Sequence, residues 1–362
     1  MSELQHLLRA NHVNSFESAK LLLNEEPYCL NIRYSDDLYR FHYTDKSDKT
    51  NPVVKECAGI VLEMSTNEIV SYGMNAFEDE KINPVPSGTL ITRSIDGTLI
   101  RLFHREGVWH ISTTKSIDAG QAYWSSNKNF KELFLEACEK TTFDWTELNV
   151  DYTYSFVLQH PECRNVSPID SGMRIIHVAT RDLCTLKEVP IFGKECLYSV
   201  TRPAILDIDN FEEDEEKVPW EIQGYVMQTP DFRRYKFKNP AWLEVQELKG
   251  NHPDMVLRFI ELVREETSSS WFRFSECFPE YESGFNRTVS LYIDLPIILY
   301  GKFKYYFIER RGKLTNSEPM YHGLMSLYVR FKQSGGNEPT TLEVVKDYVE
   351  NCSVEDIAKL IN

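Results

Sequence analysis

The chain has 362 residues, a length typical of two domains, and its 42% hydrophobic content is enough for a packed core in each. The formal net charge of -15 repels polyanions at long range, so nucleic-acid binding would need a local basic patch. No apolar stretch is long enough for a membrane span, and the N-terminus lacks the layout of a secretory signal. We therefore expect an intracellular, cytoplasmic globular protein without membrane contact.

The spacing of the cysteines and histidines favours structural roles for both. The eight cysteines form neither a C-x-x-C pair nor a His/Cys cluster at zinc-ligand spacing, so we expect reduced thiols and name no metal ligand. His160 and His177 lie in strand-like stretches and are expected to be structural. The acidic run at residues 207–216 is expected to be a solvated surface loop.

The first part of the chain has the short runs and turns typical of β-strands. Residues 88–93, 98–104 and 108–113 are strand-like runs separated by Asp96-Gly97 and Glu106-Gly107, which predicts an antiparallel meander. Further strands are expected at residues 152–158, 173–180 and 224–228, with a helix at residues 130–140.

After about residue 248 the pattern changes to helical periods, as in the amphipathic stretch at residues 255–266. Thr340 with Glu343 predicts a capping box before a helix at residues 342–351, and Ser353 is expected to cap the last helix. The order of elements predicts an α+β protein. We expect a sheet-rich domain at residues 1–245 and a mostly α-helical domain at residues 246–362.

Eight short motifs follow one another in the sheet-rich part. They are, in chain order, Glu56-Cys-Ala-Gly-Ile-Val-Leu-Glu63, Gly73-Met-Asn-Ala-Phe77, Ser94-Ile-Asp-Gly97, Ser112-Thr-Thr-Lys115, Ser155-Phe-Val-Leu-Gln-His-Pro161, Arg174-Ile-Ile-His-Val178, Gln223-Gly-Tyr-Val226 and Lys236-Phe-Lys238. Over roughly residues 4–248 their order and spacing resemble the bacteriophage T4 RNA ligase 1 family. The resemblance implies a covalent nucleotidyltransferase fold with ATP-grasp-like antiparallel sheets, ATP and Mg²⁺ as cofactors, RNA ends as substrates, and a viral or phage source.

The reactive positions of these motifs differ from the family pattern. In the family a lysine attacks the α-phosphate of ATP, and here Ser94 stands at that place. Four further positions that contact nucleotide or metal in the family are also replaced: Ala58 for arginine, Ala76 for lysine, and Val157 and Gln223 for acidic residues. A shift of register would offer Gln159 in place of Val157. Because a serine cannot form lysyl-AMP and an amide is a poor metal ligand beside a carboxylate, we expect self-adenylation to be lost.

Four positions match the family by side chain: Asp96, Gly97, Lys236 and Lys238. Lys236 and Lys238 would share one face of a strand and, with Arg233 and Arg234 before them, form the best local anion patch. A solvated edge strand is the alternative interpretation of the two lysines. By resemblance, Arg174 and Lys115 are further candidates for nucleotide contact.

The sequence leaves three functions open. The leading hypothesis is an RNA-ligase-like protein that binds a nucleotide or an RNA end without adenylating itself, or that binds neither ATP nor Mg²⁺. The second is an active ligase that uses Lys115 or another lysine. The third is an interaction module whose helical domain binds a protein partner. The basic and aromatic run at residues 302–313 fits an RNA-stacking surface, and equally a helix with an aromatic core face.

Overall fold

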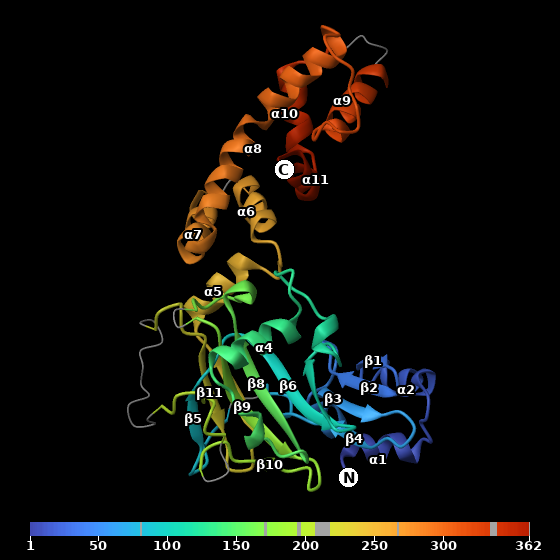
Figure 1. Cartoon of the computed structure of the whole chain (residues 1–362), viewed down its shortest axis with the longest axis vertical. Coiled ribbons are helices and arrows are strands. Elements are labelled where there is room, and N and C mark those ends of the chain that lie inside the picture. The colour runs from blue at the N-terminus through green and yellow to red at the C-terminus, as the bar shows by residue number, and fades with distance from the viewer. Residues whose placement is uncertain are drawn as a thin grey trace. The chain divides into compact units, whose positions relative to one another are not determined.

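The structure is a computed structural model of the whole chain, and it describes residues 1–79, 82–169, 172–193, 197–206, 218–265, 268–333 and 339–361. The chain divides into two compact units, Met1–Glu244 and Val245–Asn362. The strands that the structure describes lie in the first unit, and the second is helical (Figure 1). This confirms the predicted α+β class. The acidic run at residues 207–216 lies outside the described residues.

The N-terminal part of the first unit is a four-stranded antiparallel sheet in the order β1-β2-β3-β4. Its strands and the three helices before or within it are β1 (Asn31–Ser35), β2 (Leu38–His42), β3 (Ala58–Glu63), β4 (Ile69–Ser71), α1 (Glu3–Ala10), α2 (Phe16–Leu23) and α3 (Pro52–Glu56). Leu4 and Leu8 of α1 share one buried apolar cluster with Tyr39 and Phe41 of β2. The helices therefore close one face of this sheet.

A five-stranded antiparallel sheet has the order β10-β9-β8-β6-β7. It contains β6 (Thr98–Arg105), β7 (Val108–Thr113), β8 (Tyr152–Gln159), β9 (Arg174–Asp182) and β10 (Glu188–Val189). Helix α4 (Phe130–Lys140) covers one face of it (Figure 1), where Phe134 packs against Phe156 with ring centroids 5.9 Å apart. Three short 3₁₀ helices, η1 (Ala119–Gln121), η2 (Trp145–Glu147) and η3 (Pro161–Cys163), lie between these strands in sequence.

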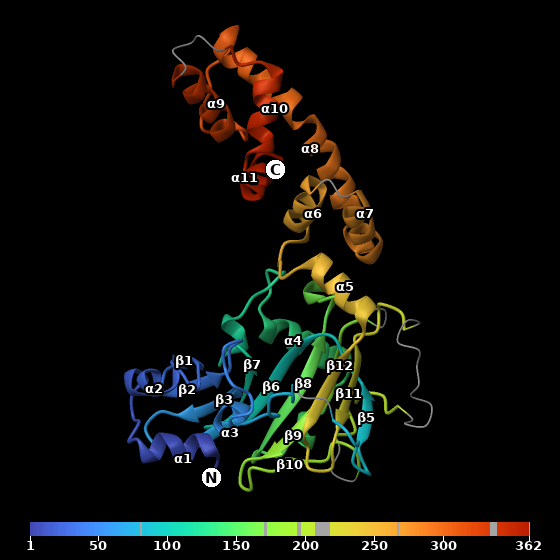
Figure 2. The ribbon, with the colours of Figure 1, turned by 180° about the vertical axis from the view of Figure 1, so that it is seen from behind.

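A three-stranded sheet, β12-β11-β5, completes the first unit; seen from behind, its strands lie side by side (Figure 2). It consists of β5 (Leu90–Arg93), β11 (Gly224–Gln228) and β12 (Arg234–Lys238). The predicted meander is therefore wrong in its first turn, because β5 pairs with β11 and only β6 and β7 form a hairpin. Asp96-Gly97 is not a hairpin turn but the connection that carries the chain from one sheet to another, called here the crossing. Just before it, the Ser94 backbone N–H still donates to the Gly224 carbonyl.

The later helices of the helical unit pack around an apolar cluster that includes Leu299, Leu324 and Val345. Its elements, starting with the helix that crosses the unit boundary, are α5 (Pro240–Lys249), α6 (Met255–Arg264), α7 (Ser268–Cys277), η6 (Pro279–Tyr281), α8 (Glu282–Phe303), the π-helix η7 (Lys304–Ile308), α9 (Tyr321–Gln333), α10 (Leu342–Glu350) and α11 (Val354–Ile361). Thr341, not the predicted Thr340, caps α10, because its hydroxyl is the one that accepts from the Val344 N–H. Ser353 caps α11 as predicted.

Two further features concern the whole described chain. None of its helices is both long and apolar enough to span a lipid bilayer. The seven cysteines that the structure describes are all free thiols, in agreement with the prediction from their spacing.

Candidate functional site

The crossing from β5 to β6 is fixed by a close approach between backbones. A Cβ atom at Gly97 would lie 2.5 Å from the Leu158 carbonyl oxygen and 2.6 Å from Val157 Cγ1, so glycine is required there. Val157 thus lies directly against the crossing. The three-stranded sheet presents Ser94 and Gln223 from neighbouring strand ends on either side of the same point.

The side chains of Ser94 and Gln223 are hydrogen-bonded to each other. The Ser94 hydroxyl donates a hydrogen bond to Gln223 Oε1 at 2.7 Å, and Gln223 Nε2 lies 3.4 Å from Asp96 Oδ1. All three side chains are buried, with no more than 8% of their surface exposed. Because buried polar groups need partners, this chain of contacts accounts for the hydroxyl and the amide without any ligand.

The Asp96 carboxylate holds the loop at residues 165–167. Its Oδ2 accepts the backbone N–H groups of Val166 and Ser167 at 2.9 and 2.8 Å, and its Oδ1 accepts from Asn165 Nδ2 at 3.3 Å. The loop in turn bonds to α5, since Trp242 Nε1 donates to the Ser167 hydroxyl at 3.1 Å. The carboxylate therefore has a structural role, which was not predictable from the sequence because the loop is about 70 residues away in the chain.

Gln159 and Arg174 extend the same network behind the crossing. Gln159 Nε2 donates to the Asp96 carbonyl at 2.8 Å, and Gln159 Oε1 accepts from Arg174 Nε at 2.7 Å. The side chain that reaches the crossing with polar atoms is thus Gln159, whereas Val157 offers a methyl group.

Lys236 and Lys238 both line a cavity of about 840 Å³ at the end of β12, together with Phe77, Arg93 and Tyr225. Burial lowers the pKa of Lys236 to about 8; nearby Lys238 lowers it further, while Asp96 opposes the shift. Within the described part of the chain, the Lys236 amine forms no ion pair or hydrogen bond, and its Nζ lies 5.8 Å from the Phe77 ring centroid. A partly buried cation without an anion is costly unless a ligand supplies one.

A second cavity, of about 170 Å³, adjoins the first at Lys236. Ser94, Gly97 and Val157 line it, so the structure brings these three predicted positions together with Lys236. Its volume is below the roughly 300 Å³ at which small-molecule sites begin, whereas the larger cavity is well above it. A nucleotide therefore fits the larger cavity and not the smaller one.

The remaining predicted positions lie elsewhere. Ala76 lines a separate hollow of about 510 Å³ with Arg233 and Arg234, and exposed Lys115 follows β7 and lines none of these three cavities. Arg234 pairs with Glu188 at 2.5 Å, and Arg233 pairs with Asp231 at 2.8 Å. The predicted anion patch is thereby reduced to its two lysines.

Ala58 is covered by an arginine that sequence reasoning missed. Arg101 of β6 is 1% exposed, and its guanidinium donates to the carbonyl groups of Ala58 and Gly59. Burial lowers the pKa of Arg101 to about 10. The lack of a side chain at Gly59 and Gly73 makes room for it. Arg101 therefore fills the space between the four-stranded and five-stranded sheets beside Ala58.

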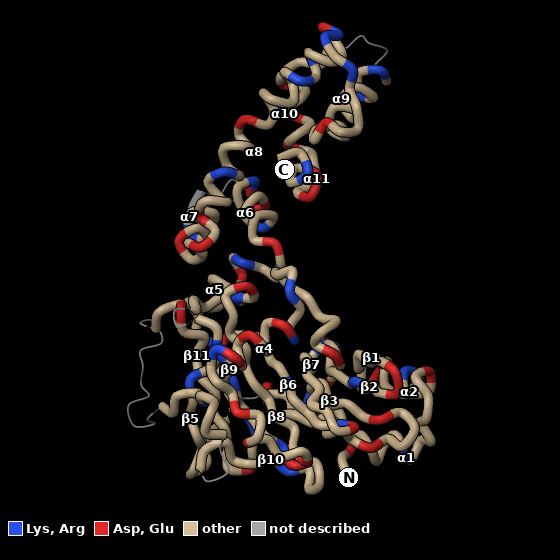
Figure 3. The backbone as a smooth tube through the Cα atoms, viewed as in Figure 1, with Lys and Arg blue, Asp and Glu red and all other residues tan. Residues whose placement is uncertain are grey.

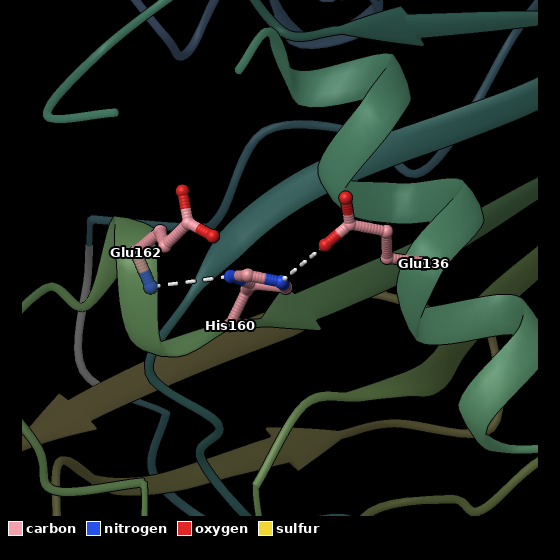
Figure 4. Close-up of side chains that lie close together, drawn as sticks. All are labelled: Glu136, His160 and Glu162. Carbon is pink, nitrogen blue, oxygen red and sulfur yellow. Dashed lines mark hydrogen bonds and ion pairs between the residues drawn. The ribbon is translucent and has the colours of Figure 1, made fainter. Parts of the chain in front are cut away.

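A cluster of Glu136, His160 and Glu162 has ligand atoms within 4.8 Å of one another (Figure 4). His160 Nδ1 accepts from the Glu162 backbone N–H at 3.1 Å, so Nε2 carries the ring proton and faces Glu136 Oε2 at 3.3 Å. Lys128 Nζ already lies 3.0 Å from Glu136 and 2.7 Å from Glu162. The Lys128 ammonium group supplies the positive charge that a metal ion would otherwise bring. The cluster is therefore an ion network, and His160 has the structural role expected for it.

Comparisons with known proteins place these features in context. No protein-family model matches the chain. Over 345 residues it is 22% identical to the immediate-early protein ICP-46 homolog of Invertebrate iridescent virus 6. This match covers 84% of this chain and 70% of that protein. Over 212 residues it is 29% identical to the RNA ligase of Rhodothermus phage RM378, with 48% of each protein covered. The chain is a relative of RNA ligases.

The match to the phage ligase spans about half of that protein, and both of these relatives are viral. Among solved structures, an archaeal ATP-dependent RNA ligase is similar, with 10% identity, a TM-score of 0.44, and 77% of this chain and 74% of that chain covered.

Proposed function

We propose that this chain is an RNA-ligase-like protein that does not adenylate itself and that binds a phosphate-bearing ligand, a nucleotide or an RNA end, at Lys236 and Lys238. One observation carries the proposal. Ser94 and Gln223, which the family resemblance puts in place of the nucleophile and of an acidic residue, are hydrogen-bonded to each other, while the Lys236 amine lines an 840 Å³ cavity without an ion pair in the described chain.

The chemistry at Ser94 argues against a replacement nucleophile. A serine hydroxyl attacks phosphorus only when a neighbouring base removes its proton. The group that accepts from the Ser94 hydroxyl is the amide oxygen of Gln223, which is no base at any physiological pH. Mg²⁺ would also find a poor site, because the Asp96 carboxylate is occupied by backbone and amide donors.

The larger cavity has what a phosphorylated ligand needs. Lys236 and Lys238 offer ammonium donors on one side of β12, since side chains alternate along a strand. Tyr225 and Phe237 are stacked with centroids 4.7 Å apart and line the same cavity, next to Arg93. By the same alternation these rings and Arg93 lie on the opposite face of the sheet from the two lysines, so the lysines carry the proposed phosphate contact.

Titration calorimetry with ATP tests the binding claim. We expect the variant Lys236→Ala/Lys238→Ala to bind at least about tenfold more weakly than the native chain, the effect of one lost charged contact or more. The matched control, Lys20→Ala/Lys140→Ala, removes two exposed lysines elsewhere in the first unit and should bind as the native chain does. Equal affinity in all three proteins contradicts the proposal.

One observation favours a second function, an active ligase that uses Lys236. This amine lines both the small cavity beside Ser94 and the larger cavity that fits a nucleotide, and its pKa of about 8 leaves about a tenth of it neutral at pH 7. In that reaction the Lys236 nitrogen forms a bond to the α-phosphorus of ATP, the bond to the β-phosphate oxygen breaks, pyrophosphate leaves and the amine proton passes to water. Mapping of an acid-labile AMP group to the peptide that contains Lys236 would select this function over the first.

A further inference from the structure

The end of the helical unit at residues 300–333 differs in charge from the rest of the chain. It holds seven lysines or arginines and two glutamates, whereas the whole chain has 40 basic and 55 acidic residues. Figure 3 shows basic positions gathered around the end of α8 and around α9. Such a local excess on an acidic protein indicates a polyanionic partner.

Four of these seven cations have no carboxylate partner in the part of the chain that the structure describes. They are Lys304, Arg310, Lys313 and Lys332, and we call them the tip patch. The other three form ion pairs: Lys302 with Glu318 at 2.5 Å, Arg311 with Glu309 at 3.0 Å, and Arg330 with Asp347 at 3.1 Å. The structure thus neutralises some of the positive charge and leaves the tip patch for a ligand.

Aromatic rings hold two of these lysines at the same end of the unit. Lys304 Nζ lies 5.7 Å from the Tyr300 ring centroid, and Lys332 Nζ lies 5.5 Å from that of Tyr328. Phe307 stacks on Tyr328 with centroids 4.4 Å apart, which joins η7 to α9. The run is therefore not only a helix with an aromatic core face, because its rings also position ammonium groups at the surface.

The loop after η7 brings the arginine and the third lysine beside an exposed ring. The Arg311 backbone N–H donates to the Tyr305 carbonyl at 3.0 Å, so the loop folds back on the π-helix. Tyr305 is 42% exposed and Ile308 is 56% exposed. Cations next to an accessible tyrosine are the combination that contacts both the phosphates and the base faces of a single strand.

We propose that the tip patch binds the backbone of a single-stranded nucleic acid, with Tyr305 available to stack on a base. An acidic protein would also complement the charge, but only a single strand presents a flat base with every charged phosphate, which matches cations beside an exposed ring. This inference is independent of the proposed function, because it concerns the helical unit and no residue of the Lys236 cavity.

Fluorescence anisotropy with labelled oligouridylate and oligothymidylate, both without terminal phosphates, tests the inference. The variant Lys304→Ala/Arg310→Ala/Lys313→Ala/Lys332→Ala should bind both at least about tenfold more weakly at low salt. The slope of log affinity against log salt should fall in magnitude by about 3, because each lost phosphate contact to a single strand contributes about 0.7. The single variant Tyr305→Ala should weaken binding by about fivefold or more through lost stacking.

The matched control is Arg273→Ala/Arg287→Ala/Lys346→Ala/Lys359→Ala, which removes four exposed cations of the same unit outside the patch. Unchanged binding by the patch variant, or an equal loss in the control, overturns the inference. So does binding of polyglutamate as tight as that of the oligonucleotides. Lys236→Ala/Lys238→Ala should leave this binding unchanged, so failure here and failure of the proposed function are distinguishable.

Discussion

The polar groups near the ends of β5, β11 and β12 fall on two sides of the site, and these sides differ in how their polar groups are satisfied. On one side, Ser94, Gln223 and Asp96 are bonded to one another and to the loop at residues 165–167. On the other side, the Lys236 amine is largely buried and forms no ion pair in the described chain, although the Asp96 charge acts on it from a greater distance. A satisfied network stabilises a fold, whereas an unpaired buried charge destabilises it. The closed side is therefore structural, and the unsatisfied charge on the open side supports our proposal that this side binds a ligand.

The closed side is tested most severely by Asp96→Ala. Loss of the carboxylate leaves the buried N–H groups of Val166 and Ser167 without an acceptor, so we expect the free energy of unfolding to fall by roughly 3–5 kcal/mol. Urea denaturation followed by circular dichroism measures the change. Asp96→Asn keeps one oxygen and should lose about half as much. A loss below about 1 kcal/mol for the alanine variant would show that the network is not structural.

A substitution on the open side should raise the free energy of unfolding, whereas the substitution on the closed side lowers it. Lys236→Met removes a cation whose pKa is lowered from 10.5 to about 8, so we expect unfolding at pH 7 to cost on the order of 1–3 kcal/mol more than in the native chain. The penalty is complete below pH 8, where the amine is charged in both the folded and the unfolded states. It fades between pH 8 and 10.5, so the gain measured by urea denaturation should shrink over that window. A destabilised methionine variant would remove the contrast between the two sides.

The pH dependence of ligand binding sharpens the same contrast. The Lys236 amine must be protonated to bind phosphate, and its pKa is about 8. Affinity for ATP should therefore change little around pH 7 and fall above pH 8, by up to about tenfold per pH unit. Calorimetry across pH 7 to 10 measures it. Affinity that stays constant until the ordinary range of lysine, above pH 10, would show that Lys236 does not contact the ligand.

The smallest effect is expected at Ser94, which we propose stands in place of a nucleophile. Ser94→Ala removes the hydroxyl and leaves Gln223 Oε1 without its donor, which should lower the free energy of unfolding by about 1 kcal/mol. ATP affinity should stay within about twofold of the native value. Ser116→Ala, a half-exposed serine after β7, is the control and should change stability by less than about 0.5 kcal/mol. A large loss of ATP affinity in Ser94→Ala would give the hydroxyl a direct role.

Much of the local structure was predictable because it depends on neighbouring residues. Helix α4 spans the predicted residues 130–140, where Asn129 and Glu132 form a capping box, and β6 and β7 pair around the Glu106-Gly107 turn. Pairing between distant strands was not predictable in this way. Asp96-Gly97 has the composition of a hairpin turn, but the carboxylate is held by a loop about 70 residues away, which carries the chain into another sheet.

The candidate site shows the same limit. Alternation along β12 was sufficient to place Lys236 and Lys238 on one side, and both line the larger cavity. The position of Arg101 in the space beside Ala58 was not predictable from the sequence, because a single arginine among strand residues is usually solvated. The division of the cleft into a small and a large cavity depends on packing between sheets, which no local pattern encodes.

Intact-mass spectrometry after incubation with ATP and Mg²⁺ shows whether the chain adenylates itself. The native chain should keep its unmodified mass, and Ser94→Ala should behave identically, because the hydroxyl has no base and the nearby carboxylate is occupied. Gain of one AMP group by the native chain, lost on mild acid treatment as a phosphoramidate is, would contradict the account.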